Sequence, residues 1–549
     1  MKMTKRILAL ALTLVMALSL AACGGKSNAN ANANANTETK TEETTETTET
    51  PETVTNDIVV ASASLGSTLN PWDQVDGTTS AFQYATYDFL VKYPTITDEN
   101  GNLVADTSNV VGSLAESWDV NPEQTEWVFH LNPNATFANG DKVTAEDVVW
   151  SFTNCRENAN SSFFFTLTNI DTMEVIDEET VKFTLTHKSN MFLRLLEIYN
   201  FAVVNKDEAE AAIASDPDYL TTHTAGSGPY TIETYDTTSE VKFVAREDYW
   251  NEEGKAQNNS VTWKLVQEPS DRQLLLQNGD VDIALDLEDK NISAVAEMEG
   301  VNVLQFASNK HLFLCLNNEV APFDNPKVRE AIAYAIPYDD LVNEVMYGNA
   351  VRTTSMLPDN VSGHISIEGE TYVNQDLEKA KALLAEAGYP DGFSCEMTLG
   401  NGFTDWEESA VTIQYALSQI GIDMKINEID RAAFLTEAAN KQIPIFLNRF
   451  NPFIGDPGYL CNCIFTSEAS YNYYNFYNEE FDALYEKAET ATSEEERLAC
   501  YEEMQYIFGD ENPVIELYQY GWAYCGRDNV SGFRFSPDLT LRFPNLSKG

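Results

Sequence analysis

The chain has 549 residues, and 86 acidic residues against 34 basic ones give it a formal net charge of −52. This length exceeds one ordinary hydrophobic core, so two or three lobes are expected. The acidic balance argues against nucleic acid as a partner, because phosphates require a basic surface. It also disfavours a folded surface that lies against anionic lipid. The charge of a small ligand stays open, because an acidic surface commonly serves solubility.

The N-terminal segment has the pattern of a bacterial lipoprotein signal. A basic start precedes an apolar run from Ile7 to Leu20, which is too short to span a bilayer comfortably. The run ends in Leu-Ala-Ala-Cys, which resembles a lipobox and predicts acylation of Cys23. An ordinary signal peptide with a chance cysteine is the alternative. The expected location is therefore the extracytoplasmic side of the cell membrane, held by a lipid anchor.

The segment that follows is of low complexity. Residues 26–56 are rich first in Asn and Ala, then in Thr and Glu. Such a stretch has little apolar surface to bury, and repulsion between the Glu side chains extends it. We expect a disordered tether between the lipid anchor and the folded body.

The best-patterned part of the chain is residues 114–152, which predict strand, turn, strand, turn and helix. The second strand alternates apolar and polar residues, so one of its faces should be buried. Asn139 and Gly140 predict a tight turn with positive φ angles. Thr144 is expected to cap the helix, with Asp147 at the third helical position.

Other elements follow from periodicity and from turn signals. Strands are expected at 58–63, 241–245 and 513–518, and helices at 78–92, 326–335, 376–388, 408–420 and 493–507. Strands and helices mix without a repeat, which predicts an α/β or mixed α+β body.

Several motifs stand out along the chain: Leu114-Ala-Glu-Ser-Trp118, Trp127-x-Phe-x-Leu131, Phe137-x-x-Gly-Asp141, Thr144-Ala-Glu-Asp-Val148, Gly226-Ser-Gly-Pro-Tyr230 and Asn325-Pro-x-Val-Arg-x-Ala-Ile332. Together they resemble the signature of the family 5 extracellular solute-binding proteins. These are the oligopeptide and dipeptide receptors of ABC importers, with nickel and oligosaccharide relatives. The resemblance covers about residues 57–540 and also implies a helix over 187–201.

The resemblance implies a two-lobed periplasmic-binding-protein-like fold with an extra subdomain in the first lobe. Crossover strands near 313–318 and 513–518 would join the lobes, with the ligand held between them. The implied divisions are a signal peptide at 1–22, a lipid-anchored linker at 23–56, lobe I at 57–100, 223–310 and 516–549, its subdomain at 101–222, and lobe II at 311–515.

The sequence offers no pattern that points to catalysis, a metal or a cofactor. None of the five His residues has metal-ligand spacing, and Gly226-Ser-Gly228 lacks the Lys-Ser/Thr of a phosphate loop. An enzyme is not expected; a glycosidase stays the open alternative, without a carboxylate pair to nominate. Seven cysteines follow Cys23, and this odd number leaves at least one unpaired in a monomer.

The ligand class is where the sequence departs from the family. Peptide receptors of the family carry an Asp three residues before an Asp-Pro or Glu-Pro pair, and this Asp pairs with the terminal ammonium of the peptide. Here Asp456-Pro457 matches the pair, so Phe453 occupies the Asp position. A buried ammonium without a carboxylate costs on the order of several kcal/mol. Either Asp456 or Asp405 supplies the charge, or the ligand has no free ammonium there.

Other side chains suit different ligand groups. Arg449 is suited to a carboxylate, a phosphate or a sugar hydroxyl, while Phe450 and Trp406 are suited to stacking. The candidate ligand-binding residues are Asp405, Trp406, Arg449, Phe450, Asn451, Phe453 and Asp456.

The predicted function is capture of oligopeptides or dipeptides and their delivery to an ABC permease and ATPase complex. Alternatives are a receptor for a non-peptide solute, such as an oligosaccharide or a metal chelate, and a surface sensor. The expected partners are a peptide or other small solute, the permease and ATPase, and the membrane through the lipid anchor at Cys23. The chain is expected to act as a monomer.

Overall fold

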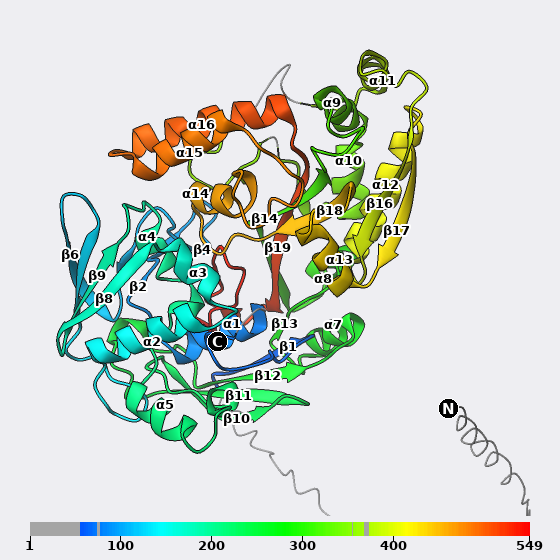
Figure 1. Ribbon diagram of the computed structural model, residues 1–549. Coiled ribbons are helices and arrows are strands. Elements are labelled where there is room, and N and C mark those ends of the chain that lie inside the picture. The colour runs from blue at the N-terminus through cyan, green and yellow to red at the C-terminus, as the bar shows by residue number, and fades with distance from the viewer. Residues whose placement is uncertain (1–54, 74–76, 354, 367–372) are drawn as a thin grey trace, which may run out of the picture. The chain divides into compact units, whose positions relative to one another are not determined.

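Two long neighbouring strands, β14 (Val301–Leu316) and β19 (Val514–Arg527), run side by side through the largest sheet (Figure 1). The computed structural model describes residues 55–73, 77–353, 355–366 and 373–549. The predicted signal peptide, Cys23 and nearly all of the predicted linker lie outside the described residues.

The largest sheet has eleven strands in the order β10-β11-β12-β1-β13-β19-β14-β18-β16-β17, with β15 paired to β19 off this path. Strand β1 is parallel to β12 and β13, and β16 is parallel to β17 and β18. The bounds are β1 Asp57–Ser62, β10 Tyr230–Asp236, β11 Glu240–Ala245, β12 Ser260–Leu265, β13 Ile283–Ala284, β15 Ala350–Val351, β16 Ser394–Gly400, β17 Asp423–Ile429 and β18 Ile445–Phe450.

The pairing of β14 with β19 changes partway along both strands. Val301–Ala307 lies opposite Gly521–Arg527, in the part of the sheet next to β13. From His311 onward, β14 lies between the first part of β19 and β18. The register shifts between Ala307 and His311. Each long strand of this mixed α/β fold therefore has different neighbours in two parts of the sheet, and the register shift lies between those parts.

Helices flank both parts of this sheet (Figure 1). In the β1 part they are α1 Gly77–Thr86, α7 Pro269–Asn278 and α8 Asp289–Ala296. In the β16–β18 part and beyond they are α9 Pro326–Ala335, α10 Tyr338–Asp340, α11 Leu377–Glu386, α12 Thr404–Ser418, α13 Arg431–Ala439, α14 Pro457–Leu460, α15 Glu479–Thr490 and α16 Glu494–Glu511, with π-helical turns at Leu341–Val345 and Cys461–Phe465.

A second, four-stranded sheet has the order β6-β7-β9-β8 and contains the best-patterned segment of the sequence. Trp127, Phe129 and Leu131 are buried on one face of β7, as predicted. The Thr144 side chain accepts from the Asp147 backbone N–H, and the Asp147 carboxylate accepts from the Thr144 backbone N–H. This capping box confirms the predicted start of the helix. The bounds are β6 Ala115–Val120, β7 Glu126–Leu131, β8 Ile170–Asp177, β9 Thr180–Leu185, α2 Ala145–Glu157, α3 Ser162–Leu167, α4 Phe192–Leu195, α5 Lys206–Ile213 and α6 Tyr219–Thr222.

Short elements complete the fold. Three small sheets pair β21 with β4 and β3, β2 with β5, and β20 with β22. Their bounds are β2 Val91–Lys92, β3 Thr95–Thr97, β4 Leu103–Ala105, β5 Val111–Gly112, β20 Val530–Ser531, β21 Arg534–Phe535 and β22 Ser547–Lys548, and two 3₁₀ turns lie at Tyr199–Phe201 and Glu252–Gly254.

The predicted helix over 78–92 is too long, because α1 ends at Thr86. The Thr86 carbonyl accepts from the Gly228 N–H at 3.0 Å. This bond to a distant segment replaces the bond within the helix that the Thr86 carbonyl would accept if α1 continued. A Cβ at Gly228 would lie 2.5 Å from the Thr86 carbonyl carbon, which explains the glycine. Two residues on, Asp88 accepts from the side chains of Tyr249 and Trp250.

The helix implied over 187–201 is also wrong in extent. Only α4 and the turn at Tyr199–Phe201 are helical there. The side chains of Lys188, Asn190 and Arg194 instead bond to distant backbone carbonyls, and these tertiary contacts replace a continuous helix. In the predicted turn, only Gly140 has a positive φ, of 92°.

All seven cysteines of the folded body are free thiols, and six of them are buried. Within the described ranges, no helix is long and apolar enough to cross a membrane.

Candidate functional site

Five side chains converge where β14 and β19 cross between the lobes. Lys310 comes from β14, Tyr520 from β19 and Arg449 from β18, while Phe403 and Asp405 lie at the start of α12. The Lys310 Nζ atom lies 4.1 Å from the centre of the Tyr520 ring. The Arg449 Cζ atom lies 4.5 Å from the centre of the Phe403 ring and 6.0 Å from that of Tyr520. We call these five residues the crossover cluster.

Hydrogen bonding and ring packing fix the aromatic part of the cluster. The Tyr520 hydroxyl donates to the Asp405 carboxylate. Trp406 is buried, and its ring centroid lies 4.7 Å from that of Phe403. Tyr518 packs edge-on against Tyr520 at 5.1 Å. The rings therefore form a preorganised wall that positions the charged groups.

The charges of the cluster are perturbed by their surroundings. Burial, and next the neighbouring charge of Arg449, lower the pKa of Lys310 to about 7. Burial raises the pKa of the nearby Asp289 to about 6. A small cavity of about 160 Å³ lies beside them, with Asp286, Asp289, Lys310 and Trp522 in its wall. Perturbed groups beside a cavity are typical of a binding site.

Phe453 makes its ring contacts with residues outside this cluster. It packs edge-on against Phe164 of α3 and Tyr199, both at 5.5 Å between centroids. Phe450 packs against Tyr471 at 5.6 Å. The Phe453 side chain thus makes an apolar contact to the four-stranded-sheet unit.

Asp456 is buried, and other side chains of the protein already use its carboxylate. One oxygen accepts from Arg497 and from the Gly458 backbone N–H, which it caps at the start of α14. The other lies 3.4 Å from the Arg194 guanidinium of α4. Asn451, five residues earlier, has a buried side-chain oxygen without a hydrogen-bond partner in the described part of the chain.

Further contacts join α4 and its flank to the end of α15. The Asn190 side chain donates to the carbonyls of Ala488 and Glu489 at 2.9 and 3.1 Å, and Lys188 donates to the Ala491 carbonyl. A cavity of about 470 Å³ lies next to these contacts. Its lining comes from both sides: Thr166, Leu167, Asn169, His187, Met191, Asn462, Tyr485, Glu486, Glu489 and Thr490.

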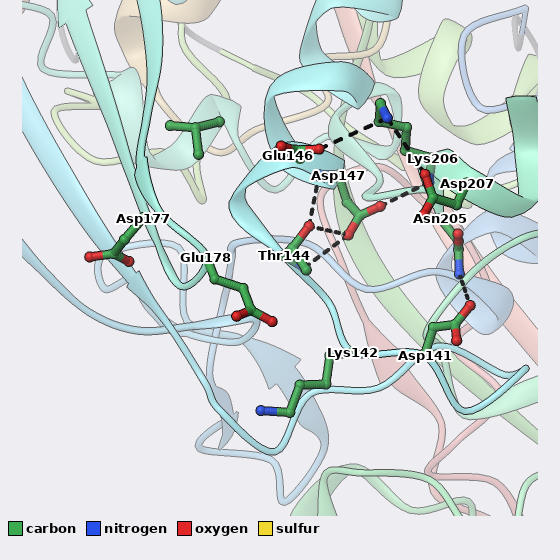
Figure 2. A pocket seen from close by; sticks show the side chains of 11 residues that line it. Asp141, Lys142, Thr144, Glu146, Asp147, Asp177, Glu178, Asn205, Lys206 and Asp207 are labelled. Atoms are coloured by element: carbon green, nitrogen blue, oxygen red, sulfur yellow. Dashed lines mark hydrogen bonds and ion pairs between the residues drawn. The ribbon is translucent and has the colours of Figure 1, made fainter.

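A third pocket, of about 460 Å³, lies beside the capping box of α2 (Figure 2). Figure 2 shows Asp147 between Thr144 and the segment at Asn205 and Lys206. The Asp147 carboxylate accepts from the Thr144 hydroxyl at 2.7 Å and from the Lys206 backbone N–H at 2.8 Å. Its role is therefore to join α2 to the start of α5. Among the residues that the structure describes, no group of three or more His, Cys, Asp or Glu side chains is arranged to hold a metal ion.

The structure divides the seven candidate residues among three places. Asp405, Trp406 and Arg449 meet at the crossover cluster, Phe450 and Phe453 lie in aromatic contacts, and Asn451 and Asp456 lie in the adjoining loop and α14. Sequence reasoning missed Lys310, Phe403 and Tyr520. A lysine separated by only His311 from a run of apolar strand residues was the one available signal.

Comparison with known proteins matches residues 109–472 to the bacterial extracellular solute-binding proteins, family 5 Middle. The chain is 28% identical to the probable D,D-dipeptide-binding periplasmic protein DdpA of Escherichia coli, over 88% of this chain and 93% of that protein. It is 27% identical to the glutathione-binding protein GsiB of Salmonella typhi, over 90% and 94%.

Solved structures show the same fold. The periplasmic binding protein DppA of Helicobacter pylori, in complex with the peptide STSA, superposes with a TM-score of 0.76 at 25% identity, over 90% of this chain and 98% of that one. HbpA2 of Haemophilus parasuis superposes with a TM-score of 0.80 at 24% identity, over 90% and 100%. The family match covers more than half of the chain, so this protein belongs to the bacterial extracellular solute-binding proteins of family 5.

Proposed function

We propose that this protein is the substrate-binding lipoprotein of an ABC importer, and that it delivers short peptides to a membrane permease and its ATPase. The crossover cluster is the observation that carries this function, because it gathers polar, charged and aromatic side chains at the junction of the lobes. Similarity to receptors named for D,D-dipeptides, glutathione and the peptide STSA supports peptides as the ligand class.

The mechanism is reversible closure of the two lobes around the ligand. The register shift near Ala307 and His311 provides a hinge within the long strands. A ligand favours closure only through contacts that it makes better in the closed state. Groups from β14, β18, β19 and α12 already meet at this hinge, so a ligand there touches elements of both lobes. We propose the lobe boundaries inferred from the sequence as part of this mechanism. Lobe closure requires no covalent step.

The lipid anchor is proposed from the sequence around Cys23, which lies outside the described residues. Cys23→Ala removes the acylated thiol, so the variant should leave the membrane fraction for the medium or the soluble fraction. Cell fractionation measures this, with Cys155→Ala as a matched control that keeps the lipobox. A Cys23→Ala chain that stays membrane-bound contradicts the anchor.

Ligand identity is tested on the purified protein. Native mass spectrometry identifies the solute that co-purifies, and calorimetry then compares free and N-acetylated forms of any peptide found. Tight binding of a peptide supports the receptor function. A co-purified sugar or metal chelate that binds tightly, with no binding of peptides, overturns the peptide assignment while keeping the receptor role.

One observation favours a second ligand class, namely solutes that lack a free ammonium. Phe453 offers no charge, and Asp456 already interacts with Arg194 and Arg497. N-blocked peptides and anionic non-peptide solutes fit these surroundings better than a peptide that needs an acidic anchor at this position.

A further inference from the structure

A cavity of about 360 Å³ lies where the C-terminal segment packs against α1 and the residue after β2. Its wall includes Tyr84 of α1, Tyr93 after β2, Glu197 after α4, Arg534 of β21 and Arg542 near the C-terminus. The last four of these side chains are each less than a tenth exposed. The described residues that line this cavity include none of the crossover cluster, so it is a separate polar site.

Three side chains of the wall carry a buried hydrogen-bond donor that has no acceptor in the part of the chain that the structure describes. These donors are Nε of Arg534, Nη1 of Arg542 and the hydroxyl of Tyr93. Other N–H groups of the two guanidiniums are already bonded. Arg534 donates to the Ser536 hydroxyl at 3.0 Å and to the Tyr93 carbonyl at 3.1 Å. Arg542 donates to the Asp538 carboxylate at 2.8 Å. Because buried donors without acceptors are destabilising, the wall calls for an acceptor from outside the chain.

The charges around the cavity favour an acceptor that is an anion. Burial, and next the charge of Arg542, lower the pKa of Arg534, so the two guanidiniums repel each other. Asp538 pairs with Arg542, while Glu197 lies 3.9 Å from that guanidinium. Burial raises the pKa of Glu197 to about 7, so near neutral pH its protonated form leaves one cation uncompensated. Asp88, the other buried acid of the wall, already accepts from two side chains.

We propose that this cavity binds a small carboxylate, held by the N–H groups of Arg534 and Arg542 and by the Tyr93 hydroxyl, and that Glu197 takes up a proton from solvent as the carboxylate binds. A single uncompensated cation suits a monoanion, because burial of a second negative charge would be costly. The Tyr84 ring holds one side of the site in place, since its centre lies 3.5 Å from Cζ of Arg542.

A titration with acetate, followed by thermal melting of the purified protein, tests the site. Acetate should raise the melting temperature at pH about 6.5 relative to chloride of equal ionic strength, and acetamide, its uncharged counterpart, should not. Tyr93→Phe should bind acetate about tenfold more weakly, because a hydrogen bond to a charged group is lost. Tyr506→Phe is the matched control, because Tyr506 is exposed on α16. Wild-type affinity for acetate in Tyr93→Phe would mean that acetate binds elsewhere, and it overturns the site.

The folding of the variants is checked in the same measurement. Tyr93→Phe removes a hydroxyl that has no partner in the described chain, so in chloride it should melt at or above the wild-type temperature. Arg534→Lys keeps the positive charge but removes the guanidinium N–H groups, so it should also bind acetate more weakly. A folded Arg534→Lys chain that binds acetate as tightly as wild type overturns the site.

Proton uptake is a readout that a merely structural carboxyl group would not give. The titratable groups that face Glu197 are Tyr84, Tyr93, Arg534, Asp538 and Arg542. A bound anion favours the neutral form of Glu197, so affinity for acetate should fall as pH rises from about 6 to about 9. A pH-stat at pH about 7.5 should record uptake of a fraction of one proton for each acetate bound.

Glu197→Gln keeps a neutral side chain over the whole range. Its affinity for acetate should not change with pH, and its binding should take up no proton. Glu116→Gln is the matched control, because Glu116 is exposed in β6 and should leave both readouts as in wild type. Wild-type binding without proton uptake, or a Glu197→Gln chain with the wild-type pH dependence, overturns the assignment.

These experiments are independent of the receptor function, because the cavity shares no described residue with the crossover cluster. Acetate binding that depends on Tyr93, in a protein that binds no peptide, overturns the peptide function and leaves this site standing. Tight peptide binding, with an acetate effect equal to that of acetamide, overturns this site and leaves the receptor standing.

Discussion

Glu489 is a carboxyl group that the fold holds in unfavourable surroundings. Burial, and next the charge of Asp456, raise its pKa to about 7, well above the ordinary value for a Glu carboxyl group. Its Oε1 atom accepts from the Tyr501 hydroxyl at 3.1 Å, while the two arginines nearby, Arg194 and Arg497, pair with Asp456. The charges of Arg497 and Lys188 lower the pKa of Glu489 by less than burial and Asp456 raise it.

This raised pKa gives a stability prediction with a defined sign. The folded state binds the Glu489 proton more tightly than the unfolded state, so stability from this group falls as pH rises from about 4.5 to 7. Glu489→Gln removes the ionisation and should stabilise the protein at pH about 8 by on the order of 1 kcal/mol, with little effect below pH about 5.

Thermal melting at both pH values checks this, with Glu486→Gln on the exposed side of α15 as the control. A Glu489→Gln chain that melts lower than wild type at the higher pH would contradict it.

At the scale of single residues, the sequence predicted those that act through local geometry and missed those that depend on strand register. Thr144 and Asp147 were recognisable because a capping box lies within four residues. Arg449 and Asp405 were found only through the family pattern. Lys310 meets them because β14 crosses between lobes, and no local pattern encodes where that crossing falls.

At the scale of elements, helix starts were predicted better than helix ends. Helices α9 and α16 begin after Asn325 and Ser493, whose side chains accept from the backbone as capping residues do. The end of α1 instead depends on the Gly228 backbone, more than a hundred residues away. Apolar periodicity continued past Thr86 because residues 87–91 are buried too, although not as a helix. A segment can be buried without being helical. The spacing of apolar residues in the sequence indicates burial, but it does not by itself indicate a helix.

The capping box of α2 gives a prediction for this scale. Thr144→Ala leaves the Asp147 backbone N–H without its side-chain acceptor and should destabilise the protein by about 1 kcal/mol. Thr153→Ala in the same helix is the matched control, since Thr153 only donates back to the Val149 carbonyl and alanine has the higher helix propensity. Urea unfolding of both variants measures the difference. Equal stability of Thr144→Ala and wild type would show that the box contributes nothing.

At the scale of the whole molecule, the lobe boundaries proposed from the sequence imply two kinds of connection between the lobes. The continuous strands β14 and β19 form the covalent connection. The side-chain contacts of Arg194, Asn190 and Phe453 form the other, and they lie far along the chain from the hinge. The family resemblance predicted the two lobes, but the contacts that close them involve residues 188–194, which were expected to be helical.

Closure by a ligand is the first prediction here. The radius of gyration from small-angle scattering should fall when the ligand identified by mass spectrometry saturates the protein, because the lobes rotate about the strands near His311. A tight ligand that leaves the radius unchanged would exclude hinge closure.

The ion pair between Arg194 and Asp456 gives the second prediction. Arg194→Ala leaves the buried Asp456 with Arg497 as its remaining cation partner, so the ligand-free protein should open more readily. Scattering should give a larger radius of gyration for this variant in the absence of ligand. Arg156→Ala is the control, because Arg156 is exposed in α2 and contacts its neighbour Glu157 and the Phe165 ring of α3, away from Asp456. An Arg194→Ala radius equal to that of wild type and control would show that this contact does not hold the lobes together.

The seven free thiols allow local opening of the protein to be followed by chemical labelling. Burial raises the pKa of Cys155, Cys395 and Cys525 to about 12, so these sulfurs stay protonated and slow to react. Cys155 lies in α2, Cys395 in β16 and Cys525 in β19. A maleimide reagent followed by peptide mapping therefore times the transient exposure of Cys155 and Cys525, which are buried, with the partly exposed Cys395 as an internal reference. The order in which Cys155 and Cys525 are labelled gives the order in which α2 and β19 become exposed.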